Sequence, residues 1–317
     1  MRLRGESFVF IGDQPSRLAL LPAPRAQLEL RSTYQPQHNT IRYEAGRDYR
    51  LDAAQNALIR LPGSRLPDFR TNVLYGQRRF DHTRFPGYGN LPFFAYADYN
   101  TSQRIEARKT VRAPQLRGTR AKLRKGERLR IVAFGDSITW GGEASAARLI
   151  FWQRWVRDLR ANHPHARITA HNGATGGDTT TQGLERLDEK VLRLKPDLVL
   201  VGFGMNDHNR GSITLPRFRR QLREIVERIR ATGAEVILYP AFPPNPHWRH
   251  SAHRMERYAA ATRDVAGATD CAFANVFAFW QHIATRKRPE DLLANNINHP
   301  NDFGHWIYYQ ALAAVLR

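Results

Sequence analysis

The feature that most constrains the fold is an alternation of short apolar runs with amphipathic segments, from about residue 126 to the end of the chain. Apolar strands that alternate with helices are typical of a parallel sheet covered by helices on both faces. We therefore predict a three-layer α/β/α domain over residues 126–317. The expected strands are 129–134, 167–170, 198–201, 236–239 and 273–276, and the expected helices are 146–160, 182–194, 215–231, 254–265 and 301–316.

Residues 1–125 show a different pattern, in which short β-prone pieces are separated by proline and glycine. No helical periodicity is sustained there, so we predict a smaller accessory domain of the β-sandwich, jelly-roll-like class. The expected strands are 7–11, 18–21, 27–30, 44–52 and 56–61, the last two joined by a turn at 53–55. The basic run 117–130 alternates with Leu123 and Leu129, as a half-exposed strand or linker would.

The formal net charge of +20 comes mostly from arginine and raises the question of a nucleic-acid partner. The basic residues, however, are spread over the whole chain. In segment 215–231 they occupy the face of an amphipathic helix opposite its apolar face. This distribution indicates a solvated surface, so nucleic acid is not expected as the primary partner.

Further classes of protein are disfavoured by what the sequence lacks. There is no stretch of about twenty apolar residues, so we expect no membrane span. The N-terminus has no apolar signal-peptide region, which favours the cytoplasm as written, or the periplasm or exterior if a leader was removed. The single cysteine, Cys271, excludes an internal disulfide framework and a cysteine-based zinc site. It lies in an apolar run, and we expect a buried thiol.

Chemistry-bearing residues follow the expected strands. Gly135-Asp136-Ser137 follows the first, and taken alone it is an ordinary turn sequence. It is not the Gly-x-Ser-x-Gly elbow of lipases, because Thr139 stands in place of the second glycine. A glycine-rich loop (171–180) follows the second strand, Gly204-Met205-Asn206-Asp207 follows the third, and His299 precedes the last helix. Ligands bind beyond the carboxyl ends of parallel strands, so this edge offers a nucleophile, a base and oxyanion donors.

These four blocks, in this order, resemble the SGNH (GDSL-type) hydrolase family over about residues 128–317. The resemblance implies that Ser137 is the nucleophile and His299 the base that takes its proton. It also implies an oxyanion hole formed by the backbone N–H groups of Ser137 and Gly177 and by the side-chain amide of Asn206. No cofactor or metal is implied.

One departure concerns the residue that orients the histidine. The family carries Asp three residues before its histidine, whereas this chain has Asn296. An Asp-to-Asn change in a serine protease triad lowers turnover about 10⁴-fold, because the imidazole takes the wrong tautomer. Three replacements are open: the side-chain oxygen of Asn296, a backbone carbonyl, or a distant carboxylate such as Asp291. We expect Asn296 or a backbone carbonyl.

The β-domain ahead of the hydrolase also resembles the layout of some carbohydrate acetyl-esterases. This implies an ester substrate with a short acyl chain, specifically an O-acetyl group on a sugar. The alternatives are a lipid-directed lipase, thioesterase or lysophospholipase, and a carbohydrate- or polyanion-binding protein that has lost catalysis. Trp140, Asp207 and Trp248 are the expected pocket residues, while Asp136 and Asp178 are expected to brace their loops. The sequence does not indicate an oligomeric state.

Overall fold

The computed structural model describes residues 1–317 except 25–26, 106–115, 210–212 and 317. The chain forms two compact units, each assembled from segments that are far apart in sequence. Unit 1 comprises Met1–Glu106, Asn245–Arg249 and Gln281–Gly304, and unit 2 comprises Ala107–Pro244, His250–Trp280 and His305–Arg317. The expected division into functional domains near residue 125 stays a prediction.

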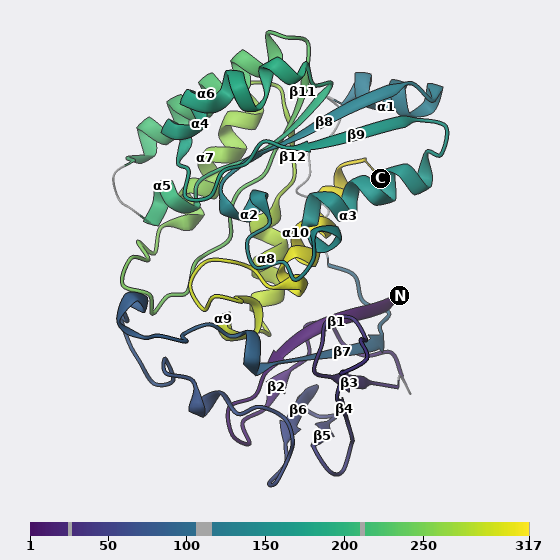
Figure 1. Cartoon of the computed structure of the whole chain (residues 1–317), viewed down its shortest axis with the longest axis vertical. Coiled ribbons are helices and arrows are strands. Elements are labelled where there is room, and N and C mark those ends of the chain that lie inside the picture. The colour runs from purple at the N-terminus through teal and green to yellow at the C-terminus, as the bar shows by residue number, and fades with distance from the viewer. Residues whose placement is uncertain (25–26, 106–115, 210–212, 317) are drawn as a thin grey trace. The chain divides into compact units, whose positions relative to one another are not determined.

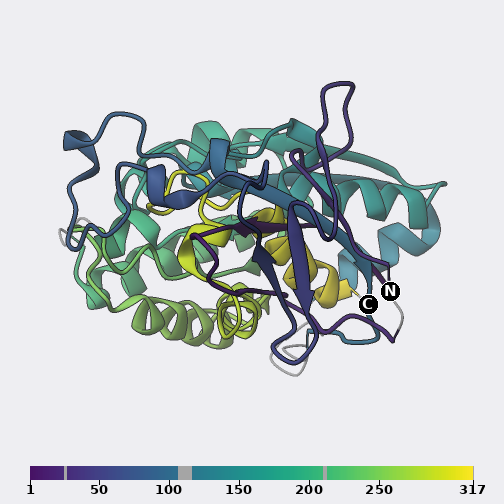
Figure 2. The same cartoon turned by 90° about the horizontal axis from the view of Figure 1, so that it is seen from below.

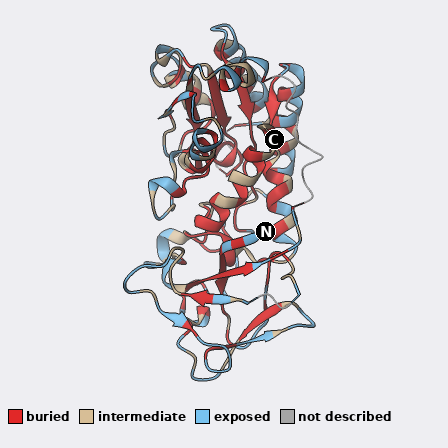
Figure 3. Ribbon diagram, turned by 90° about the vertical axis from the view of Figure 1, so that its right-hand side faces the viewer, coloured by how far each residue is buried: buried red, intermediate tan, exposed pale blue. Residues whose placement is uncertain are grey.

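Unit 2 contains the predicted parallel sheet. Its strands are β8 (Arg128–Gly135), β9 (Arg167–Asn172), β10 (Leu198–Gly202), β11 (Glu235–Leu238) and β12 (Ala272–Phe273). They lie in the order β12-β11-β10-β8-β9, and every neighbouring pair is parallel. Strand β10 is buried along its whole length, as Figure 3 shows for the middle of the sheet. A strand buried on both faces reads as a continuous apolar run, which is why the sequence located it.

Helices cover both faces of this sheet, which confirms the predicted three-layer class. Helices α4 (Thr180–Lys190), α6 (Leu215–Arg230) and α7 (Met255–Ala268) lie side by side on one face (Figures 1 and 2). Helices α3 (Phe151–Asn162) and α10 (Asp302–Leu316) are joined on the other face through Tyr309 and Asp158. The other helices of the described residues are α1 (Arg117–Lys125), α2 (Ser137–Trp140), α5 (Met205–Asn209), α8 (Val276–Ala284) and α9 (Pro289–Leu292).

The expectation of a strand or linker at the start of the basic run is wrong, because Arg117–Lys125 forms helix α1. Thr119 and Leu123 are buried, and their four-residue spacing places them on one helical face. The helix start is fixed from β11, where the Glu235 carboxylate accepts hydrogen bonds from the backbone nitrogens of Gly118 and Thr119, each at 2.7 Å. The sequence around α1 carries no sign of this distant capping group.

Unit 1 contains the predicted antiparallel sheets. One sheet has the order β1-β7-β3-β4 and the other β2-β6-β5. The expected strand 44–52 begins only at Tyr49, because residues before it form a turn around the buried Asp48, which accepts a hydrogen bond from the Glu44 backbone nitrogen at 2.9 Å. The strands are β1 (Arg2–Val9), β2 (Ser16–Arg17), β3 (Glu29–Arg31), β4 (Arg42–Tyr43), β5 (Tyr49–Asp52), β6 (Ala57–Arg60) and β7 (Phe94–Asn100). Between β6 and β7 lie the 3₁₀ turns η1 (Phe69–Thr71), η2 (His82–Arg84) and η3 (Leu91–Phe93).

Unit 1 also includes the segment Gln281–Gly304, whose helix α9 packs against β1. Two apolar clusters join this segment to the N-terminal part of the unit. Ala294 packs with Val9, Phe69, Phe94 and Tyr96 in the first cluster, and Ile297 packs with Leu74, Phe80 and Trp248 in the second. The segment that carries His299 is therefore part of the core of the unit.

Candidate active site

The candidate nucleophile lies where β8 ends at the sheet edge. Gly135 and Gly202 are partners in the register of β8 and β10, and a Cβ atom on Gly135 would lie 2.2 Å from the Gly202 carbonyl oxygen. Only glycine fits such an approach. The chain then turns into α2, whose first residue is the partly exposed Ser137. The Asp136 side chain caps α2 by accepting a hydrogen bond from the Ile138 backbone nitrogen at 3.0 Å.

The carboxyl group of Asp136 is buried beneath this turn. The pKa of Asp136 is raised to about 7, mainly by burial and also by the neighbouring Asp207 and Asp178, while the hydrogen bond from Ile138 acts in the opposite direction. A carboxyl group with such a pKa changes its charge near neutral pH, so the charge next to Ser137 depends on pH.

The glycine-rich loop after β9 lies against the same turn. The backbone nitrogen of Thr175 donates to the Gly135 carbonyl at 3.0 Å, which holds the loop to the end of β8. A Cβ atom on Gly176 would lie 3.9 Å from the Cβ of Ser137, so this loop passes directly beside the serine. Gly177 has a φ of +80°, a left-handed conformation that favours glycine.

Asn206, at the carboxyl end of β10, is tied to this loop. It lies in α5, is 8% exposed, and its side-chain nitrogen donates to the Asp178 carbonyl at 2.9 Å. An amide nitrogen carries two hydrogens, and this contact uses one of them. The loop and the amide therefore form one bonded group beside Ser137.

A second link holds the same two loops together. The buried Asp207 carboxylate accepts hydrogen bonds from Thr180, at 3.0 Å from its backbone nitrogen and at 2.5 Å from its hydroxyl. Burial raises the pKa of Asp207, and the two bonds from Thr180 act against that rise. Asp207 therefore bonds the first residue of α4 and helps to cap this helix, next to the capping box formed by Thr179 and Gln182.

A serine after the first strand, a glycine loop beside it and an asparagine tied to that loop thus meet at the edge formed by β9, β8 and β10. Residues 133–307, more than half of the chain, match the GDSL-like Lipase/Acylhydrolase family. The chain belongs to this family. Its C-terminal portion has the fold of a solved structure, that of the acetylxylan esterase Axe2 from Geobacillus stearothermophilus, with a TM-score of 0.53 and 23% identity over 59% of this chain and 94% of that one.

Curated relatives of this GDSL-family chain include an acetylxylan esterase and an arylesterase. The acetylxylan esterase of Geobacillus stearothermophilus is 26% identical over 208 residues, which cover 60% of this chain and 94% of that protein. The arylesterase of Vibrio mimicus is 31% identical over 123 residues, which cover 38% of this chain and 60% of the relative. The chain thus spans less than two thirds of the arylesterase.

The other predicted site residues, His299 and Asn296, belong to unit 1. They lie in a tight loop that Ala294 closes by donating its backbone N–H to the His299 carbonyl at 3.0 Å. The Asn295 side-chain oxygen accepts hydrogen bonds from the backbone nitrogens of Ile297, Asn298 and His299 at 3.0, 3.0 and 2.9 Å. The backbone of His299 is therefore fixed on both sides.

The side chain of Asn296 faces the segment before η3. Its oxygen accepts a hydrogen bond from the Asn90 side-chain nitrogen at 3.0 Å, and its nitrogen donates to the Tyr88 carbonyl at 3.3 Å. Asp291, the alternative orienting carboxylate, is buried and accepts hydrogen bonds from the backbone nitrogens of Val9 and Arg288. Both side chains thus have structural partners within unit 1.

The expected pocket residues are placed differently from one another. Trp140 is 58% exposed at the end of α2, three residues after Ser137. Trp248 is buried in a cluster of unit 1 and donates to a ring nitrogen of His82 at 3.1 Å.

Among the described residues, no group of three or more His, Cys, Asp or Glu side chains could hold a metal ion. Over the same residues, none of the helices is both long and apolar enough for a membrane span. Cys271 is buried, as expected.

Sequence reasoning missed several supporting residues. The motif points to Gly177 and gives no sign of its neighbour Gly176. Asn90 carries no motif and lies 206 residues before its partner Asn296. Asn295 does have a local signal, because asparagine side chains commonly bond the backbone two positions ahead.

Proposed function

We propose that this protein is a serine esterase that removes short acyl groups, specifically O-acetyl groups carried by a carbohydrate. The observation that carries the proposal is the glycine loop beside Ser137 together with its bond to Asn206. This arrangement supplies a nucleophile and neutral donors at one point.

In the proposed mechanism the Ser137 oxygen attacks the ester carbonyl carbon while its proton passes to His299. The oxyanion accepts hydrogen bonds from the backbone nitrogens of Ser137 and Gly177 and from the second amide hydrogen of Asn206. The intermediate collapses when the carbon–alkoxide bond breaks, and the alcohol leaves with the proton from His299. Water then attacks the acyl-enzyme with His299 as base, releasing the acid and restoring Ser137.

The preference for an acetylated sugar rests on two supports. The acetylxylan esterase relative is matched over nearly its whole length. Trp140 also exposes an aromatic ring three residues from the nucleophile, and an aromatic ring offers an apolar face with a polar tip to a ligand. We assign Asp207 a supporting position beneath the oxyanion donors, since its carboxylate is buried.

The reaction type is tested by hydrolysis of p-nitrophenyl acetate. We expect activity in the wild type, loss to background in Ser137→Ala, and unchanged activity in Ser102→Ala, which removes an exposed serine of unit 1. Wild-type activity no higher than that of Ser137→Ala would reject the esterase.

The substrate class is tested separately. We expect rates on p-nitrophenyl esters to be highest for acyl chains of two to four carbons and acetate to be released from acetylated xylo-oligosaccharides. A maximum at eight carbons or more would instead favour a lipid-directed enzyme. Tight oligosaccharide binding by a protein whose Ser137 is unreactive would favour the binding protein.

A further inference from the structure

We infer that Asn90 is a positioning residue for the histidine loop, so that the segment before η3 in unit 1 is a working part of the esterase. The inference rests on the proposed role of His299 as the base. Asn296 shares the positioning role, because its side chain connects the loop to Asn90.

The loop is defined by residues 293–300, and its backbone closes on itself. Leu293 and Pro300 form an antiparallel bridge, and Ala294 donates to the carbonyl of His299. At its tip Asn296 has a φ of +59°, a left-handed conformation in which asparagine is tolerated and glycine is favoured. The side chain of Asn296 therefore leaves the loop in a fixed direction, toward Asn90.

Asn90 contacts the loop at three points and α9 at one. The two hydrogens of its side-chain nitrogen face three acceptors, Oδ1 of Asn296 at 3.0 Å, the Leu293 carbonyl at 2.9 Å and the Glu290 carbonyl of α9 at 3.1 Å, so one hydrogen is shared between two of them. Its backbone nitrogen donates to the Ala294 carbonyl at 2.7 Å. Asn90 is fully buried, so these carbonyl groups have no water to replace it. One side chain thus holds both the start and the tip of the loop.

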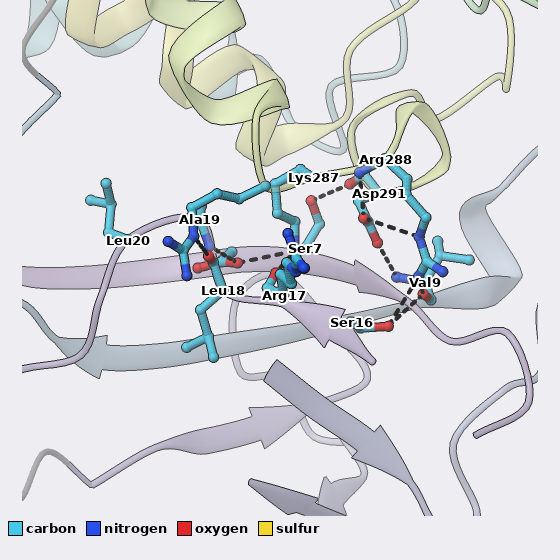
Figure 4. A network of polar contacts seen from close by, with 12 residues as sticks. Ser7, Val9, Ser16, Arg17, Leu18, Ala19, Leu20, Lys287, Arg288 and Asp291 are labelled. Carbon is cyan, nitrogen blue, oxygen red and sulfur yellow. Dashed lines mark hydrogen bonds and ion pairs between the residues drawn. The ribbon is translucent and has the colours of Figure 1, made fainter. Parts of the chain in front are cut away.

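The chain just before the loop is anchored to β1 and β2. Figure 4 shows the Ser7 hydroxyl donating to the Asp291 carbonyl, and the Val9 backbone nitrogen donating to its carboxylate at 2.7 Å. Lys287 forms an ion pair with Glu6 at 3.0 Å, and neither side chain is exposed. These anchors fix α9, so Asn90 needs to restrain only the loop that follows it.

The catalytic need for this restraint follows from the missing aspartate. In triads the carboxylate holds the imidazole in its orientation. Here Asn90 donates to the side-chain oxygen of Asn296 and to the loop backbone, so a change at Asn90 displaces the part of the loop that carries His299. A displacement of about 1 Å at a reacting group can lower turnover by about 10²-fold.

The main test compares Asn90→Ala with Thr101→Ala in the full chain, using p-nitrophenyl acetate well below the thermal transition. Thr101 is a matched control because its buried hydroxyl also bonds backbone, at Leu21, but makes its contacts within residues 1–106. We expect Asn90→Ala to lower kcat by roughly 10- to 100-fold with KM within about threefold. Thr101→Ala should keep kcat within about twofold, even where both variants lower the thermal midpoint equally.

Asn296→Gly provides a second variant that folds more readily, because glycine accepts the left-handed backbone. We expect it to lower kcat, and the double variant Asn90→Ala/Asn296→Gly to lose no more than about threefold beyond the worse single variant. Hydrogen exchange should rise in residues 293–301 in either single variant and stay at the wild-type level there in Thr101→Ala.

The outcomes separate this inference from the proposed function. A wild type that hydrolyses the ester, together with a folded Asn90→Ala of unchanged kcat, overturns the positioning role alone. Equal losses of kcat in Asn90→Ala and Thr101→Ala also overturn it. A wild type no more active than Ser137→Ala overturns the esterase and this inference with it.

Discussion

The side-chain amide of Asn206 has two roles at the residue scale, because one hydrogen holds the glycine loop and the other is proposed to meet the oxyanion. Removing one oxyanion donor typically lowers kcat by about 10²–10³. We predict this loss for Asn206→Ala in p-nitrophenyl acetate turnover. Asn209→Ala is the matched control, since it removes an amide from the same short helix, where Asn209 contacts His208. Equal activity of the two variants would contradict the assignment of Asn206.

Asp136 should make stability depend on pH. Its folded pKa of about 7 lies above the unfolded value of 3.8, so the folded state binds the proton more tightly. The stabilisation from this group is full below pH 3.8 and is lost as pH rises to about 7.

Asp136→Asn keeps an oxygen for the Ile138 bond and removes the titration. The free energy of unfolding of this variant, measured relative to that of the wild type, should therefore increase from pH 4 to pH 8. The increase should be at most about 4 kcal/mol for a shift of this size. Denaturant unfolding at pH 4, 6 and 8 measures the difference. A gap that does not change with pH would show that burial of this carboxyl has no such effect.

The residues that could be predicted from sequence are those with local signatures. Ser137, Gly177, Asn206 and His299 each stand in a recognisable block, whereas Asn90 acts on a partner far along the chain. Asp207 also stands in such a block, but its burial could not be predicted, because its place beneath α4 depends on how two loops meet. The catalytic assignments themselves stay predictions until activity is measured.

At the element scale, periodicity located the five parallel strands and the five longest helices of the α/β portion. It failed at α1, because arginines around Leu123 and Leu129 imitate the alternation of a strand. What decides the conformation there is the Glu235 carboxylate, which lies more than a hundred residues away and caps the helix.

Glu235→Ala tests this cap. Loss of a capping side chain typically lowers the free energy of unfolding by about 1 kcal/mol. We expect that loss in urea unfolding, and a change under about 0.5 kcal/mol for Glu224→Ala, which lies exposed on α6. If both variants unfold at the same urea concentration, the cap does not stabilise α1.

At the scale of the whole molecule, unit 1 draws its core from both ends of the chain. The pairing of Glu6 with Lys287 joins residues 281 positions apart, and Tyr99 and the Ala19 backbone also donate to Glu6. Burial raises the pKa of Glu6, and Lys287 opposes that rise. Hydrophobic patterning predicts which face of an element is buried, but it does not reveal which distant polar groups pair, so the bond between Glu6 and Lys287 could not be predicted from the sequence.

Breaking that pair should be costly. Lys287→Met leaves the Glu6 carboxylate without its cation, and the free energy of unfolding should fall by about 3–5 kcal/mol. Glu6→Gln/Lys287→Met should recover much of the loss, because no uncompensated charge stays buried. Arg2→Met is the control, since it breaks an exposed pair with Glu29 and should cost less than about 1 kcal/mol. Equal losses for Lys287→Met and Arg2→Met would contradict the role of the buried pair.

Covalent labelling of the intact chain by a fluorophosphonate, read by mass spectrometry and peptide mapping, tests the central claim most directly. An activated serine with an adjacent base reacts with such a probe, whereas ordinary surface serines do not. The account predicts one adduct per chain, located on Ser137 and absent in Ser137→Ala. A folded protein that takes up no probe, or takes it up at another residue, would contradict it.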